Sequence, residues 1–200
     1  MTASLETGDV YSGVRSLILP GDVVAFAGNS LISKIVQLAT RSVVSHCAIV
    51  LEIEIEKPER RVMLLEATSL GGYPYAQITP LSFHVDHYDG SLWWLPLSKP
   101  VRARFDVSAF EPWALSQVGK PYSFLGSVEV VLDDWFDHHP PEERDDFARL
   151  FCSEATASGL EVGGAIEKID ASTLSPKDVL ALGIYERAVQ LRGDQIDLSV

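Results

Sequence analysis

A cysteine and a histidine in this chain have the surroundings that thiol chemistry requires. Cys152 lies in the segment LFCSEA (150–155), and His46 lies in VSHCAIV (44–50). A thiol is a useful nucleophile only as the thiolate, and its pKa falls from about 8.5 at a helix N-terminus or beside an imidazolium. If a helix begins at Cys152, its free N–H groups can lower that pKa and receive an acyl oxyanion. If a helix beginning near Glu142 continues through it instead, Cys152 belongs to an apolar helix face.

His46 opens an apolar segment that is typical of a strand. An imidazole there can sit at a sheet edge and take the thiol proton as a general base. Glu66 stands in the otherwise apolar run 62–67, where a carboxylate is costly to bury unless it is paired. Pairing with the second ring nitrogen of His46 would satisfy both side chains. The alternatives are a strand histidine bonded to the backbone and a glutamate exposed at the strand end.

Other histidines allow a zinc site as an alternative. His84 and His87, with Asp86 between them, can ligate zinc together with His46 or Cys47. The spacing matches no familiar zinc pattern, however, and a polar loop between strands accounts for these residues. We therefore expect no metal and no other cofactor.

Composition and missing motifs exclude several classes of protein. The 200 residues are 46% hydrophobic and 22% charged, as in an ordinary folded domain. The net charge of −12 repels phosphate backbones, so we expect no nucleic-acid partner. Nothing matches GxSxG, GxxxxGK[ST], GxGxxG or HExxH, which argues against esterase-elbow, nucleotide-binding and zincin sites.

The sequence also predicts where the protein resides. Glu6 and Asp9 precede any apolar run, and no basic start with a small-residue cleavage site follows the pattern of a secretory signal. The longest apolar runs are far short of the roughly 20 residues that span a bilayer. We expect a cytoplasmic protein without stable membrane insertion, in which Cys47 and Cys152 stay reduced.

The elements that must position His46 and Glu66 occupy the first half of the chain. After a loose lead-in at 1–17, apolar and β-branched runs separated by polar turns predict a small antiparallel sheet or half-barrel. Ser30 is a candidate N-cap for a helix to about Ala39 that carries an apolar stripe. The expected strands are 22–27, 45–56, 62–67, 76–81 and 91–97, with the second and third forming a hairpin.

The second half is expected to be mostly helical. The predicted helices are 108–118, ended by Gly119, then 141–159, and a short helix after Ser175 that reaches about Leu182. We therefore predict a single α+β domain over 1–200, with a mostly strand half at 18–104, a mostly helical half at 105–182 that carries Cys152, and a tail at 183–200.

The four tryptophans suggest a possible groove. Trp93, Trp94, Trp113 and Trp135 could line it for a ligand, although aromatic residues at this density are more often part of the core.

In order, these segments resemble the circularly permuted, NlpC-like branch of the papain-like cysteine hydrolases, a superfamily that also includes the lecithin:retinol acyltransferase type. Permuted members present histidine before cysteine, as this chain does. The resemblance extends over about residues 18–180. It rests on the segments 20–24, 32–40, 45–51, 65–67, 119–122 and 151–154.

The resemblance implies a thiolate–imidazolium pair of Cys152 and His46, with Glu66 as the orienting residue, that acts on an amide or ester through an acyl-enzyme. It further implies that Tyr122 helps to shape the oxyanion site, although Tyr122 could equally be a packing residue. Cys47, directly after His46, is expected to point to the opposite strand face and to lie in the core.

The predicted function is that of a cysteine peptidase or amidase whose substrate is a peptide or a peptidoglycan fragment. A lipid thioesterase or acyltransferase with the same three residues, acting on an acyl-lipid substrate, is the second possibility. An apolar cleft would favour it. A catalytically inactive binding module is the third, and an occluded or misaligned Cys152 would favour that one.

Overall fold

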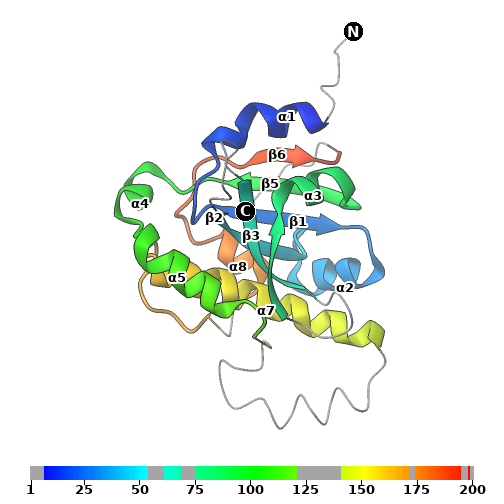
Figure 1. Cartoon of the computed structure of the whole chain (residues 1–200). Helices are drawn as coiled ribbons and strands as arrows, with labels where there is room; N and C mark the ends of the chain where they lie inside the picture. The colour runs from blue at the N-terminus through cyan, green and yellow to red at the C-terminus, as the bar shows by residue number, and fades with distance from the viewer. Residues whose placement is uncertain are drawn as a thin grey trace.

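A computed structural model of the chain describes residues 7–53, 61–68, 75–120, 141–171, 174–194 and 198, without the side chains of 7–9, 32, 39 and 141–151. The fold is α+β, with one six-stranded sheet in the order β4-β3-β2-β1-β5-β6 and antiparallel pairing throughout (Figure 1). The strands are β1 (Val23–Gly28), β2 (His46–Ile53), β3 (Arg61–Thr68), β4 (Tyr75–Pro80), β5 (Gly90–Leu95) and β6 (Val189–Arg192).

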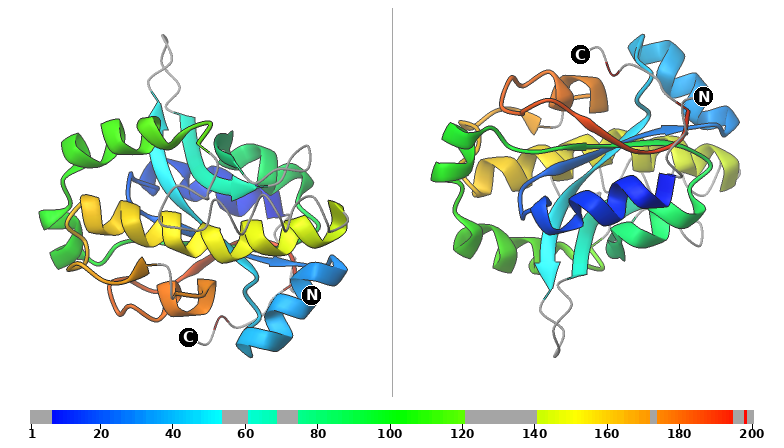
Figure 2. Two further views of the ribbon diagram at one scale, coloured as in Figure 1. Left: turned by 90° about the horizontal axis from the view of Figure 1, so that it is seen from below. Right: turned by 90° about the horizontal axis from the view of Figure 1, so that it is seen from above.

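Helices cover both faces of the sheet. They are α1 (Thr7–Val14), the 3-10 helix η1 (Arg15–Leu17), α2 (Leu31–Thr40), α3 (Leu81–His87), α4 (Lys99–Arg104), α5 (Val107–Gln117), α7 (Pro141–Val162) and α8 (Pro176–Leu180). Figure 2 shows α7 crossing one face, seen from below, and α1 crossing the other, seen from above. None of the described helices is long and apolar enough to cross a membrane.

Alternating side chains divide the strands between two cores. Cys47 and Ile49 of β2 face the core that contains Cys152 and Leu160 of α7. Ala48 and Val50 face the opposite core, which α1 and α3 complete. Gly159 lets α7 pack closely on the sheet, because a Cβ atom there would lie 2.9 Å from Ile49 Cδ1. Both faces of the central strands are therefore buried.

Local sequence signals predict several of these elements correctly. The β2–β3 hairpin is present, and strand β1 occupies the predicted segment. The Ser30 side chain caps α2 by accepting a hydrogen bond from the backbone N–H of Ser33. Ser175 and Asp178 form a capping box at α8. Gly119 follows α5 with φ of 77°, as a helix-ending glycine does.

Four segments differ from the expectation, and one of them is helix α4, in a region where no helix was predicted. The lead-in at 1–17 contains α1 and η1. Tyr11 of α1 is buried in the core that contains Ala48 and Val50. The polar turn expected between β4 and β5 is helix α3, because Leu81 and Val85, one turn apart, are both buried. The tail contributes β6, which pairs with β5 and buries Leu191. In each segment the buried apolar residues form only a short pattern, which is a weak signal in the sequence alone.

The tryptophans within the described residues belong to the core and form no groove. Trp93 and Trp94 of β5 are 2% and 6% exposed. Trp113 of α5 is partly buried and packs against the core that contains Cys152. Trp135 lies outside the described residues.

A buried aspartate anchors the start of β1. Asp22 is 1% exposed, and its carboxylate accepts hydrogen bonds from the backbone N–H groups of Leu19 and Leu97, from Trp94 Nε1 and from Arg102. These donors offset part of the cost of burying the charge, although burial still raises the pKa of Asp22 above its usual value. The network fixes β1, and hence the strand beside His46.

Replacement of this carboxylate should destabilise the fold. Asp22→Asn puts an amide N–H₂ against the donors that surround Asp22, and we expect it to lower the free energy of unfolding by about 3 kcal/mol. Urea unfolding followed by tryptophan fluorescence measures the change. The exposed residue Asp86 provides the control Asp86→Asn, which should change stability by less than about 0.5 kcal/mol. Equal effects of the two substitutions would contradict this role for Asp22.

Candidate active site

The site lies where strands β2 and β3 separate. Their pairing runs from Ile53↔Arg61 to Ile49↔Leu65 and goes no further. Beyond that point the first residues of β2 stay paired with β1, and the last residues of β3 stay paired with β4. Backbone groups of β2 near Cys47 are thus left without strand partners on the β3 side. The sheet is open at this place.

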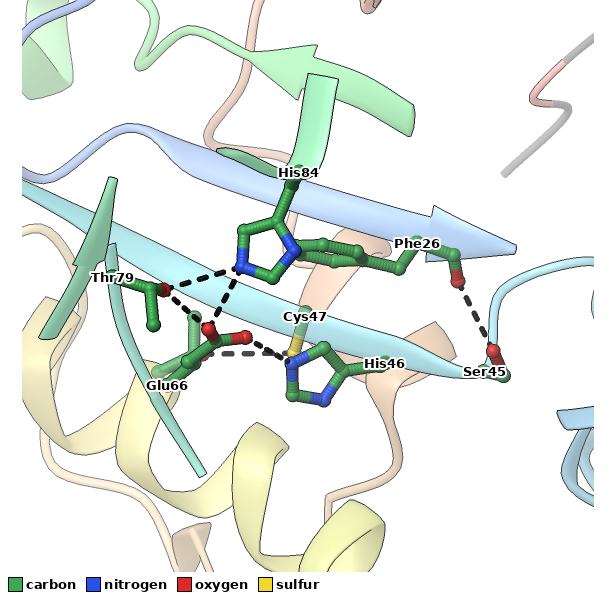
Figure 3. A network of polar contacts seen from close by, with 8 residues as sticks. Phe26, Ser45, His46, Cys47, Glu66, Thr79 and His84 are labelled. Carbon is green, nitrogen blue, oxygen red and sulfur yellow. Dashed lines mark hydrogen bonds and ion pairs between the residues drawn. The ribbon is translucent and has the colours of Figure 1, made fainter. Parts of the chain in front are cut away.

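Glu66 of β3 lies between two histidines on one face of this opening (Figure 3). Its Oε2 is 3.2 Å from His46 Nε2, and its Oε1 is 2.8 Å from His84 Nε2. The hydroxyl of Thr79 in β4 donates to Glu66 Oε1 and is 3.2 Å from His84 Nε2. The ring of Phe26 packs against both histidines. Glu66 is only 3% exposed, so these contacts replace its hydration.

Cys152 reaches His46 from the other face. Cys152 belongs to the core under α7, whereas His46 packs on Phe26 in the opposite core, yet the sulfur and the imidazole are hydrogen-bonded. The contact therefore crosses the sheet where the β2–β3 pairing has stopped. Because His46 Nε2 bonds Glu66, the nitrogen that remains for the sulfur is Nδ1.

Two groups of Cys47 also contact the nucleophile candidate. The backbone N–H and the thiol of Cys47 both hydrogen-bond Cys152. The Cys47 thiol contacts Thr156 Oγ1 at 3.6 Å, one turn along α7. Cys47 is fully buried in the core, as expected for the strand face opposite His46, but its contact with Cys152 was not predicted. Both cysteines are free thiols.

Cys152 does not begin a helix. It lies well inside α7, which starts at Pro141, so the prediction of free helical N–H groups at its sulfur is wrong. The helical spacing that connected Cys152 to Glu142 gave the correct helix. The N–H that serves the sulfur comes instead from Cys47, at the open edge of β2.

The charges of Cys152 and His46 support each other. Burial alone would raise the pKa of Cys152, but the Cys47 thiol, His46 and the Cys47 N–H lower it well below the ordinary thiol value. Burial would lower the pKa of His46, whereas Cys152 and then Glu66 raise it to about 10. Both directions favour a thiolate–imidazolium pair at neutral pH.

The orienting carboxylate stays ionised. Burial would raise the pKa of Glu66, but the hydrogen bonds from His46 and then His84 hold it well below the ordinary range. The Cys47 thiol behaves oppositely, since burial and the neighbouring Cys152 raise its pKa well above the usual value. These directions favour a charged Cys152 sulfur beside a neutral Cys47 thiol.

The structure brings together Cys152, His46 and Glu66 but not the zinc ligands considered as an alternative. His84 joins the site through Glu66, whereas Asp86 and His87 are exposed, and His87 stacks on Phe83. No group of three His, Cys, Asp or Glu residues in the described part of the chain is arranged to hold a metal ion. Tyr122 lies outside the described residues.

Sequence reasoning missed Thr79 and Gln77 of this site, and it considered His84 only as a zinc ligand. Thr79 and His84 bond Glu66, and Gln77 pairs directly opposite Glu66 in the β3–β4 register. Gln77 Nε2 is buried without a hydrogen-bond partner among the described residues. The period-2 placement of Gln77 and Thr79 on the face of Glu66 was the available signal. The contact of His84 with Glu66 had no such signal, because the helix that carries His84 was not predicted.

Comparison with known proteins adds little to this geometry. No protein-family model and no curated protein matches the chain. A solved structure described as the metalloprotein YiiX (DUF1105) from Escherichia coli O157:H7 is similar at a TM-score of 0.46 and 21% identity, over 86% of this chain and 87% of that one. Similarity at this level establishes neither a family nor a function.

The ionic pair predicts an unusual thiol titration. Ultraviolet thiolate absorbance of the wild type should persist well below pH 8.5, because the Cys152 pKa is lowered. His46→Ala should remove this low-pH thiolate, and Cys152→Ser should remove it as well. As pH rises through about 10, His46 loses its proton and the pair ends. An ordinary titration near pH 8.5 that is unchanged in His46→Ala would contradict the pairing.

The second histidine should act through Glu66. His84→Gln removes the imidazole contact that helps to lower the pKa of Glu66, so Glu66 becomes easier to protonate and holds the His46 cation less firmly. We expect the His46 pKa to fall by roughly one unit, measured by NMR titration of the ring signals. His87→Gln, on the same helix but without contact to Glu66, should leave the His46 pKa unchanged.

Proposed function

We propose that this protein is a cysteine hydrolase that cleaves an amide through a thioacyl-enzyme, with Cys152 as nucleophile, His46 as base and acid, and Glu66 as the orienting carboxylate. The observation that supports it is the continuous chain of contacts from the Cys152 sulfur through the His46 ring to Glu66. Acyl transfer by a thiol requires a nucleophile that is hydrogen-bonded to a base, and a third group that is hydrogen-bonded to the base and orients it.

Each residue has a defined part in the proposed reaction. The Cys152 thiolate attacks the carbonyl carbon, and the carbonyl electrons move to the oxygen. When the C–N bond breaks, the His46 imidazolium gives its proton to the leaving nitrogen. His46 then takes a proton from water, the resulting hydroxide attacks the thioester carbon, and the C–S bond breaks to release the acid. The cycle returns to Cys152 thiolate and protonated His46.

The Cys47 N–H is the proposed donor to the developing oxyanion. It bonds the thiolate before reaction, and the negative charge moves from sulfur to the adjacent oxygen as the S–C bond forms. Glu66 keeps the His46 ring oriented by accepting its Nε2–H, and His84 and Thr79 hold Glu66 in turn. The wider resemblance to permuted NlpC-like enzymes supports a peptide or peptidoglycan fragment as substrate.

One observation favours a second candidate, a binding module without turnover. Cys152 is 1% exposed, and the His46 side chain is 12% exposed. Attack on a substrate requires the sulfur to become accessible, which an inert module does not need. The two candidates differ in whether an acyl group is ever attached to Cys152.

Acylation therefore tests the proposal. A panel of activated amides and esters, together with peptidoglycan fragments, is incubated with the protein, and intact-mass spectrometry detects an acyl adduct on Cys152. We expect burst kinetics from the wild type, and a loss of kcat/KM of about 10²–10⁴-fold in Cys152→Ala and His46→Ala. Glu66→Gln should lose about 10–100-fold.

Matched controls separate chemistry from folding. His87→Ala replaces an exposed histidine, and it should retain wild-type rates. Glu154→Gln replaces a glutamate that is also mostly buried but lies outside the network, and it should do the same. If no substrate acylates Cys152 while the low-pH thiolate is present, the binding module is the better conclusion.

A further inference from the structure

Helix α2 has its two sides reversed relative to an ordinary surface helix. Most of the described side chains on its inward side are polar, with half-buried Val36 as the apolar one. Ser33 is 2% exposed and contacts Ser30, and Gln37 donates from its side-chain amide to the carbonyl of Gly28. Thr40, on the same side, donates to the Val36 carbonyl. A globular protein normally turns the apolar stripe of such a helix toward its core.

The outward side of α2 is apolar instead. Leu31, Ile35 and Leu38 are 77%, 51% and 81% exposed, and their i, i+4, i+7 spacing places them in one row along the helix. Val43, shortly after the helix, is 39% exposed. Single exposed apolar residues are normal, but a continuous row on one element indicates a surface that is covered in use.

Basic residues border this row. Lys34 and Arg41 are exposed and stand three residues after Leu31 and Leu38, respectively. The segment 29–43 contains no acidic residue, although the chain as a whole has a net charge of −12. Charges at a surface act within a Debye length of about 8 Å, so Lys34 and Arg41 act locally at this row, although Asp194 lines the same pocket as Lys34 and Asp89 accepts a hydrogen bond from Asn29.

We propose that α2 docks on an anionic membrane surface, with Leu31, Ile35 and Leu38 in the boundary between headgroups and acyl chains. Exposed leucine and isoleucine flanked by lysine and arginine form the pattern of a helix that lies in a bilayer interface. Lys34 and Arg41 then meet lipid phosphates, while the polar inner side stays on the protein. The proposal does not depend on the chemistry of Cys152.

The position of α2 relates the proposed docking surface to the candidate active site. Helix α2 follows β1 in the chain, and a short connection leads from it to His46 at the start of β2. Figure 2 shows α2 at the periphery of the molecule, at one end of the sheet. Docking there holds the opening between β2 and β3 close to the lipid headgroups. Docking is peripheral, because none of the described helices can span a bilayer.

Vesicle co-sedimentation tests the docking. The full chain is mixed with phosphatidylcholine vesicles, with and without phosphatidylglycerol, and the bound fraction is measured. We expect binding that is stronger with phosphatidylglycerol, and an at least tenfold weaker partition for Leu31→Ser/Leu38→Ser. Lys34→Gln/Arg41→Gln should lose the preference for phosphatidylglycerol. Circular dichroism checks that the variants fold, since the replaced leucines are exposed.

A matched variant elsewhere controls for general hydrophobicity. Phe83 of α3 and Leu115 of α5 are each 54% exposed, and Phe83→Ser/Leu115→Ser should bind vesicles as the wild type does. Wild type that fails to bind either vesicle, or equal losses in the two double variants, overturns the proposal. So does a dimer in light scattering that Leu31→Ser/Leu38→Ser abolishes without any vesicle binding, which would assign the surface to a second copy of the chain.

Discussion

The buried carboxylate of Glu66 is the interaction on which the rest of the site depends. A charge that is 3% exposed is tolerated only because His46, His84 and Thr79 all bond it. The same bonds join β2, β3, β4 and α3, so the ionisation of the site depends on how these four elements are arranged. Without the carboxylate, the His46 cation loses a partner, and with it the lowered pKa of Cys152 loses support.

The site also depends on the separation of β2 from β3. Had the pairing continued past Ile49↔Leu65, the Cys47 N–H would bond β3, and the sheet would stand between Cys152 and His46. The opening instead allows a cysteine from the interior of α7 to use a strand N–H in place of a helix terminus. This explains how a residue in the middle of a helix can still have a lowered pKa, an effect usually associated with helix N-termini.

Local patterns in the sequence predict the strands around His46 and Glu66, because a hairpin is set by neighbouring residues. They also predict the helix through Cys152, since its apolar spacing is continuous. The contacts of Glu66 with His84 and of Cys47 with Cys152 could not be predicted, because they depend on strand register and on how far β2 and β3 remain paired. Helix α3, which carries His84, has only Leu81 and Val85 to bury, too few for a recognisable period.

Helix α2 illustrates a different limit of sequence reasoning. Its spacing correctly indicates a helix. Of the apolar stripe expected at Ile32, Ile35, Val36 and Leu38, Ile35 and Leu38 lie in the exposed row and Val36 is half-buried, because periodicity does not report the direction in which an apolar face points. The direction is set here by Ser33 and Gln37, whose hydrogen bonds near the helix start favour the polar side as the inner one. Leu31 and Leu38 are consequently directed outward. An exposed apolar row is costly in water, and the proposed burial in a bilayer interface removes that cost.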